Sequence, residues 1–202
     1  MRIRQDEPDV VAMYEAVDQF RERSLRNLRS AFLPDDSPSA TTVWTSSTAQ
    51  ELVEKFINRP DESKRGFLDK LRDQLADASS DAVQLLVELT WLHLVVSTQL
   101  KPETKRDLID DIASIGNATT PPEPYLSALD HGIIGTGVSF QTRRPNQLWL
   151  LVRFAEAWTA ATAEDRSRWL EDPWAFREFV FGLEGLADQT QRHALLHLIH
   201  PE

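Results

Sequence analysis

The stretch that decides the fold is DAVQLLVELTWLHLVVSTQ, at residues 81–99. Its side chains are apolar almost all round a helix, so the pattern predicts a helix that other helices cover on every side. The most apolar part, Val83 to Val96, is shorter than a bilayer span and contains Glu88 and His93. The first residues of the chain also lack the apolar run of a signal peptide. We therefore expect a buried central helix, no membrane contact and a cytoplasmic protein.

Helical patterns extend from this stretch in both directions. Residues 1–33 contain one long helix, from about Asp9 to Phe32, and residues 34–46 combine Pro, Ser and Thr as a linker does. Residues 47–202 form a helical domain on which the first helix docks. The sequence predicts an all-α bundle of about nine helices, with a Gly-containing loop at 132–144 before the last third.

The composition restricts the classes of function. The chain has 202 residues, a formal net charge of -10 and no cysteine. Without cysteine there is no disulfide framework, no thiolate metal site and no cysteine nucleophile. The acidic charge repels a phosphate backbone, so any DNA binding is expected to be weak and sensitive to salt.

Two charged side chains interrupt the two most apolar helical segments. Glu88 lies within residues 81–99, and Arg153 lies within 147–160. A charge inside a fully covered helix needs a partner, and the planar guanidinium of arginine suits a carboxylate. We predict a buried ion pair between Glu88 and Arg153.

Three histidines share one face of the last helical segment. His193, His197 and His200 are spaced i, i+4 and i+7. Neutral imidazoles at i and i+4 can bind zinc, but Ala194 stands where a zinc protease has its glutamate. The favoured interpretation is a polar helix face, with neither a metal nor another cofactor in this chain.

The glycine-rich loop and the arginines behind it form a second candidate site. Residues 132–137 follow the order G-x-x-G-x-G, which is not the phosphate-binding order, so a tight turn is favoured. No Asp or Glu occurs from 131 to 155, where Arg143, Arg144 and Arg153 stand. Arg143 and Arg144 are a candidate patch for an anion or an acidic partner, but pairing with acids of neighbouring helices is the favoured interpretation.

Aromatic residues concentrate in the last quarter of the chain. The six tryptophans are Trp44, Trp91, Trp149, Trp158, Trp169 and Trp174. An aromatic cage for a modified base or a methylated lysine is one interpretation. Helical spacing such as that of Trp149, Phe154 and Trp158 favours ordinary core packing.

Three segments of the C-terminal third carry a resemblance to a known family. Residues 146–158, 172–183 and 191–201 resemble the region upstream of the AAA+ motor in McrB-type ATPases of bacterial restriction and defence systems. Residues 48–56 and 85–92 fit the same picture. The resemblance implies an AAA+ motor domain after residue 202, whose Walker motifs are absent here, and places no catalytic residue on this sequence.

The resemblance implies a non-enzymatic N-terminal module for recognition or as an adaptor, in anti-phage defence or modification-dependent restriction. Its partners would be the AAA+ motor of the same protein and a partner nuclease or other defence protein. One alternative is a helical DNA-binding specificity domain that reads foreign or modified DNA through Arg143 and Arg144. The other is a metal-dependent enzyme built on the three histidines.

Overall fold

Helix α4 (Ser80–Val95) is the central element of the molecule. The Ser79 hydroxyl accepts a hydrogen bond from the Ala82 N–H at 3.1 Å, which satisfies one of the free donors at the start of the helix. Every residue from Ala82 to Val95 is buried. The predicted central helix is confirmed, although it begins one residue and ends four residues earlier than the apolar pattern at 81–99 suggested.

The computed structural model describes residues 8–185 and 189–201, and within these ranges the fold is built from helices. The predicted all-α fold is therefore confirmed. A single parallel bridge, between Ser97 and Ile134, is the one β-type pairing in the described residues. Besides α4, the α-helices are α1 (Pro8–Phe20), α2 (Ser46–Leu52), α3 (Phe67–Gln74), α5 (Pro102–Gly116), α6 (Tyr125–Ala128), α7 (Gly137–Thr142), α8 (Arg144–Ala160), α9 (Ala163–Glu171), α10 (Pro173–Gly182) and α11 (Gln189–Ile199).

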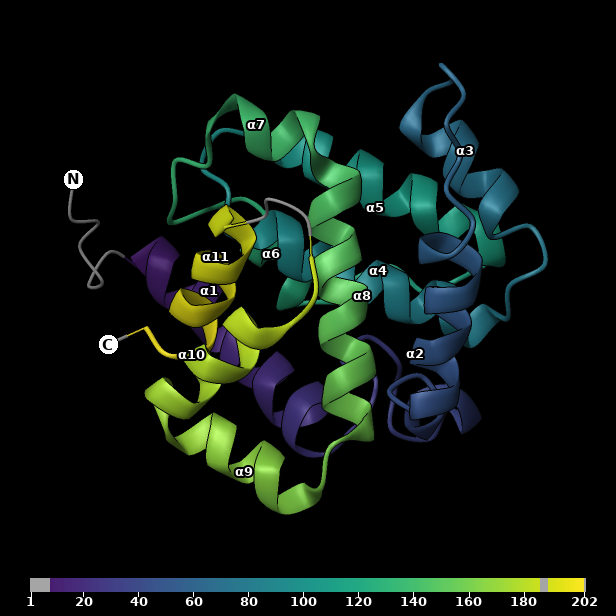
Figure 1. Ribbon diagram of the computed structural model, residues 1–202. Helices are drawn as coiled ribbons and strands as arrows, with labels where there is room; N and C mark the ends of the chain where they lie inside the picture. The colour runs from purple at the N-terminus through teal and green to yellow at the C-terminus, as the bar shows by residue number, and fades with distance from the viewer. Residues whose placement is uncertain (1–7, 186–188, 202) are drawn as a thin grey trace.

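The helices pack around α4 and α8 (Figure 1). Helix α4 packs against α5, α8 and α2, and α8 also contacts α2. Helix α1 packs against α6 and α11, while α9, α10 and α11 follow one another along the other side of α8. One continuous core runs through all these contacts, from Val10 in α1 to Ile199 in α11.

The N-terminal helix is shorter than the sequence predicted. Helix α1 continues as a π-helical segment, Arg21–Arg26, and Leu28 then adopts a positive φ of 52°. This left-handed residue reverses the chain, which brings Ser30 and Ala31 against α4. The prediction of one helix to Phe32 was wrong because the backbone turns inward to bond a buried group.

Residues 34–46 do not form the linker that their composition suggested. They include a short 3-10 turn, Pro38–Thr41, and they place Val43 and Trp44 in the core. The Trp44 indole Nε1–H donates a hydrogen bond to a Glu88 carboxylate oxygen at 2.7 Å. This segment is therefore a packed part of the bundle.

Helices α9 and α10 meet at one shared residue. The Asp172 N–H bonds the Arg168 carbonyl at the end of α9, and the Asp172 carboxylate accepts the N–H groups of Trp174 and Ala175 at 2.9 and 3.3 Å. Pro173 occupies the first position of α10, where its missing N–H does no harm. Asp172 and Pro173 together thus form the start of α10, and this start fixes where the backbone of Trp174 stands.

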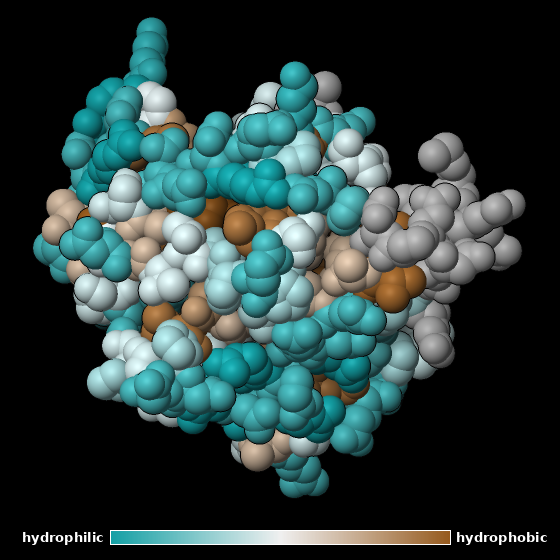
Figure 2. Space-filling view, turned by 180° about the vertical axis from the view of Figure 1, so that it is seen from behind, coloured by the Kyte–Doolittle hydropathy of each residue, from teal (hydrophilic) through white to brown (hydrophobic). Residues whose placement is uncertain are grey.

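The face opposite to the view of Figure 1 is covered mainly by hydrophilic side chains (Figure 2). Hydrophobic side chains appear there as separate small areas rather than as one broad patch. Among the helices in the described ranges, none combines the length and the apolar character needed to cross a membrane.

Candidate functional site

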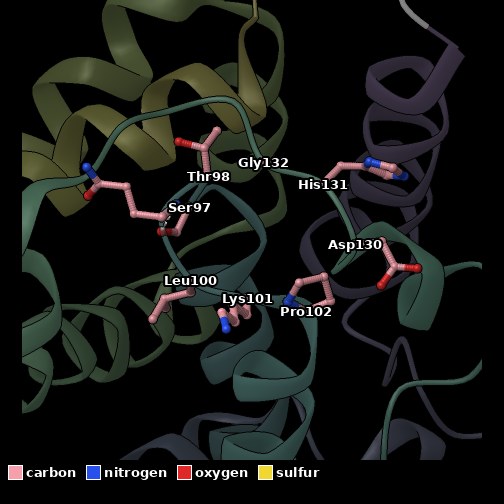
Figure 3. Close-up of a pocket in the computed structure, with 9 residues that line it drawn as sticks. Ser97, Thr98, Leu100, Lys101, Pro102, Asp130, His131 and Gly132 are labelled. Atoms are coloured by element: carbon pink, nitrogen blue, oxygen red, sulfur yellow. Dashed lines mark hydrogen bonds between the residues drawn. The ribbon is translucent and has the colours of Figure 1, made fainter.

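One pocket lies beyond the C-terminal end of α4, where residues 97–102 face residues 130–132 (Figure 3). Its volume is about 370 Å³. A hydrogen bond from the Thr98 N–H to the Ile134 carbonyl, at 3.0 Å, ties the two segments together. A Cβ at Gly132 would collide with the Ser97 carbonyl, so only glycine allows this close approach.

The glycine-rich loop at 132–137 serves this junction. The N–H groups of Ile133 and Ile134 both bond the Val96 carbonyl at 2.9 Å, and the Gly137 N–H bonds the Gln99 side chain at 2.5 Å. A phosphate-binding loop needs such N–H groups free to face its ligand. Here they hold the loop to the end of α4, which agrees with a structural turn.

The polar groups of the pocket are largely engaged within the protein. The pairs are Ser97 Oγ with Thr136 Oγ1, Thr98 Oγ1 with the Ile134 carbonyl, and Asp130 with Arg106. The His131 side chain points away from the Ser97–Lys101 segment (Figure 3). The described residues of this pocket therefore show no hydroxyl and base positioned to act as a nucleophile pair.

Lys105, next to this pocket, is a buried lysine that sequence reasoning missed. Only 1% of the residue is exposed, and Nζ donates a hydrogen bond to the His131 carbonyl at 2.5 Å. Burial lowers the pKa of Lys105 to about 8, and the charge of Asp130 opposes that shift. The sequence did contain a signal. Lys105 precedes Leu108 by three residues and Ile109 by four, so it lies on the apolar stripe of α5.

Glu88 is buried as predicted, but its partners are not. Its carboxylate accepts hydrogen bonds from four donors: Ser24 Oγ at 3.3 Å, the Ala31 N–H at 3.2 Å, Trp44 Nε1 at 2.7 Å and Ser30 Oγ. Burial raises the pKa of Glu88, and the hydrogen bonds from Ser30, Trp44 and Ala31 oppose the shift. The group holds the N-terminal segments against α4.

The predicted ion pair between Glu88 and Arg153 was wrong. Arg153 Nη1 lies 2.8 Å from a carboxylate oxygen of Glu156, one turn further along α8. Its side chain is 27% exposed and borders a surface pocket with Ile57 and Trp149. Arg153 therefore stands on the outer side of α8, because that helix is not covered all round.

The three C-terminal histidines do not converge on one point. The His197 Nε2 bonds the Tyr14 hydroxyl at 2.8 Å, the His200 Nε2 bonds the Trp169 carbonyl at 2.9 Å, and His193 is exposed beside Phe181. Burial lowers the pKa of His197 and of His200. In the described parts of the chain no three His, Asp or Glu side chains are grouped as metal ligands.

The structure separates the arginines of the predicted binding patch. Arg143 is exposed just before α8, whereas Arg144 is partly buried, and burial lowers its pKa. Arg153 is paired with Glu156. Of these three arginines, only Arg143 is exposed. A single exposed cation attracts a nucleic acid only weakly.

His93 lies in a second buried polar group, further along α4. Its Nδ1 is 2.7 Å from Gln191 Oε1, which can only accept, so Nδ1 carries the proton. The Phe140 ring stacks on the imidazole at 4.3 Å between centroids. Burial lowers the pKa of His93 to about 4, and the charge of Arg144 adds to that effect. The imidazole is therefore neutral at pH 7.

The most accessible aromatic residue is Trp174, at the start of α10. It is 73% exposed, whereas Phe154 and Trp158 are buried, as core packing predicted. The Trp169 and Phe179 rings stack beside it at 3.9 Å between centroids. A pocket of about 420 Å³ lies here, and its lining residues, named the α9–α10 surface below, are Arg168, Trp169, Asp172, Trp174, Ala175, Glu178 and Phe179.

The core interpretation of the sequence rested on spacings such as that of Trp149, Phe154 and Trp158, and it did not single out Trp174, which is exposed. The signal was its position in the first turn after Asp172 and Pro173, two residues before the buried Phe176. Residues two apart point to different sides of a helix.

No family model, curated protein or solved structure matches this chain.

Proposed function

We propose that the chain is a non-enzymatic recognition or adaptor module of the cytoplasm, which binds another protein through the α9–α10 surface and uses no cofactor of its own. The observation that carries this proposal is the 73% exposure of Trp174 beside the stacked rings of Trp169 and Phe179. Exposed tryptophans that border a pocket are typical anchors of protein interfaces.

The chemistry of the other candidate sites supports a binding role over catalysis. In the pocket at the end of α4, Asp130 is paired with Arg106 and the Ser97 hydroxyl is bonded to Thr136. A catalytic site needs such groups free to meet a substrate. Among the described residues, Trp174 is the large apolar side chain with the greatest exposure.

The resemblance stated from the sequence suggests where such a module acts. We propose that it is the N-terminal part of a McrB-like AAA+ ATPase in restriction or antiviral defence. The segments that carry the resemblance, 146–158, 172–183 and 191–201, cover most of α8 and α11 and five of the seven residues that line the α9–α10 surface, all except Arg168 and Trp169. The occupant would then be the motor domain of the same protein or a partner nuclease.

Charge favours a protein over DNA as the partner. The chain carries a net charge of -10, and of the arginines at 143, 144 and 153 only Arg143 is exposed without an ion pair to an acid in the part of the chain that the structure describes. DNA affinity rests mainly on cations that meet phosphates. Tight binding of a duplex at about 150 mM salt, lost in Arg143→Ala, would contradict the adaptor proposal.

The test is site-specific photo-crosslinking in the cell that makes the protein. A photoreactive phenylalanine replaces Trp174 in one variant and Val11, the other exposed large apolar residue of the described chain at 40%, in the control. We expect a discrete crosslinked protein from position 174 and not from position 11. With both variants folded by circular dichroism, equal products from the two positions, or none from 174, would overturn the proposal.

The identified partner then allows a quantitative check. Trp174→Ala should weaken its affinity roughly tenfold or more, because truncated aromatic anchors cost about 2 kcal/mol or more and about 1.4 kcal/mol is tenfold. Val11→Ala should leave the affinity unchanged within about twofold, as expected of a residue outside the interface. Isothermal titration calorimetry measures both.

A further inference from the structure

The α9–α10 surface combines aromatic rings with acidic groups. Its pocket is lined by the rings of Trp169, Trp174 and Phe179 and by the carboxylates of Asp172 and Glu178. We propose that this pocket binds an arginine side chain from a basic segment of a partner protein. The inference rests on the proposed function, which it deepens by naming the chemistry of the partner.

One wall of the pocket is fixed. The Trp169 and Phe179 rings are nearly parallel, 15° apart, and Trp158 packs behind both at 5.5 and 5.8 Å between centroids. The Trp169 carbonyl bonds His200, which ties this wall to the end of α11. A ring held in this way offers a rigid contact surface at little cost in conformational entropy.

The other wall is open. Trp174 lies 73% exposed, and within the described residues its ring stacks on no other aromatic ring. An indole that is fixed at the backbone but free at the ring can cover a guest that enters between it and the opposite wall. The electron-rich faces of tryptophan rings attract cations.

The charge at the pocket favours a cation. Asp172 uses one oxygen to accept the Trp174 and Ala175 N–H groups, so the start of α10 presents a carboxylate rather than bare N–H donors. Glu178 stands one turn after Trp174 and forms no ion pair within the described residues. Arg168, the cation of the lining, lies 3.5 Å from Asp165 and is partly neutralised.

The chemistry of the pocket lining favours arginine over lysine. A guanidinium is planar, so it can stack on an indole face while its edge bonds a carboxylate in two places. An ammonium is a strongly hydrated point charge and makes fewer such contacts. The arrangement of flat rings beside Asp172 and Glu178 offers both kinds of contact at once.

The experiment is an NMR titration of the whole chain, followed at the six indole N–H signals. Trp174→Phe identifies the Trp174 signal. The probes are the peptides GRGRG, GKGKG and GEGEG, and a GRGRG analogue with citrulline, the neutral isostere of arginine. We expect GRGRG to shift the Trp174 signal and to bind at least about fivefold more tightly than the citrulline and lysine peptides.

Two charge-matched variants complete the design. Glu178→Gln removes one acid from the pocket and should weaken GRGRG binding about threefold, which lies within the range of an exposed pair of opposite charges. Glu103→Gln removes one exposed acid from the first turn of α5, outside the pocket lining, and should leave the binding unchanged.

The outcomes separate this inference from the proposed function. Equal binding of GRGRG and its citrulline analogue, no shift of Trp174, or equal effects of Glu178→Gln and Glu103→Gln would overturn the arginine pocket. Equal binding of GRGRG and GKGKG would overturn the choice of arginine. Any of these results, together with a specific crosslink from position 174, would leave the protein-binding role standing.

Discussion

Glu88 and His93 stand about one and a half turns apart on the same buried helix, yet they meet opposite surroundings. Both residues are fully buried. Around Glu88, donors from three separate places in the chain converge on the carboxylate. Around His93, Gln191 provides one hydrogen bond, and the imidazole Nε2 has no partner within the described part of the chain.

The difference shows two ways to bury a titratable group. The N-terminal segments surround Glu88 with donors, and this network holds residues 24–44 against α4. His93 instead loses its charge, since burial lowers its pKa to about 4. The hydrogen bonds from Ser24, Ser30, Ala31 and Trp44 to Glu88, called the Glu88 joint below, thus fasten the N-terminal segments to α4. His93 makes one hydrogen bond, and protonation of its imidazole in acid opposes folding.

The largest effect is expected at the Glu88 joint. Glu88→Ala leaves four buried donors without an acceptor and opens a cavity, so it should lower the free energy of unfolding by about 4 kcal/mol. Trp44→Phe, which removes one donor and keeps an aromatic ring, should cost about 1–2 kcal/mol.

Urea denaturation measures these changes, with the exposed Glu54→Ala as control. The control should stay within about 0.5 kcal/mol of the parent. If Glu88→Ala lowers the free energy of unfolding by less than about 1 kcal/mol, the contrast between Glu88 and His93 is wrong. The hydrogen bonds to Glu88 would then contribute no more than one ordinary hydrogen bond.

The second effect is a dependence of stability on pH at His93. The unfolded chain binds a proton near pH 6.5, whereas the folded chain binds one only near pH 4, so folding opposes protonation between these values. The free energy of unfolding should therefore fall by about 3 kcal/mol as the pH falls through this window.

Comparison with His93→Gln isolates this contribution from that of the acids. The variant cannot titrate at position 93, so its stability should fall less steeply between about pH 6.5 and pH 4. Glu88 acts in the opposite sense, because its pKa is raised: its contribution is complete below about pH 4.5 and decreases as the pH rises. Parallel stability profiles for the parent and His93→Gln would contradict a neutral, buried His93.

The smallest effect is expected at Arg153. Its partner Glu156 lies on the same helix face, and both side chains are partly exposed, so Arg153→Ala should change the free energy of unfolding by less than about 0.5 kcal/mol. The double variant Glu88→Gln/Arg153→Ala should be additive within about 0.5 kcal/mol. A coupling energy well above that value would show that Glu88 and Arg153 interact directly, as the sequence analysis predicted.

Local patterns predicted the parts of the fold that depend on neighbours in sequence. Apolar residues on all sides of 81–99 predicted the central helix, and Asp172 before Pro173 is the local pattern typical of the helix start found at α10. The end of α5 shows how a local pattern can mislead, because a glycine at a helix end is typical of the left-handed cap. Asn117 takes the left-handed conformation, while Gly116 lies against Val83 with too little room for a Cβ.

The joint at Glu88 could not be predicted from local patterns. Its donors lie between 44 and 64 residues away in sequence, in segments that read as a helix end and a linker. The charge of Glu88 did predict that a partner exists. It did not predict that hydroxyl, indole and backbone donors would replace a cation, because such groups are common throughout any sequence.

The candidate sites show the same limit. Periodicity placed His193, His197 and His200 on one helix, but it could not tell that Tyr14 and the Trp169 carbonyl would bind two of them separately. The exposure of Trp174 depends on how α10 rests on α9 and α11. Packing between helices decides both features, and the sequence pattern of one helix does not report it.

The single residue that joins α9 to α10 has a practical consequence for protein engineering. Ordinary surface loops absorb inserted residues at little cost. At Asp172 there is no spare chain, because the same residue closes one helix and caps the next. Tags, reporters and fluorophore sites therefore belong in the exposed turn at residues 62–66, while the corner at Asp172 keeps its native length.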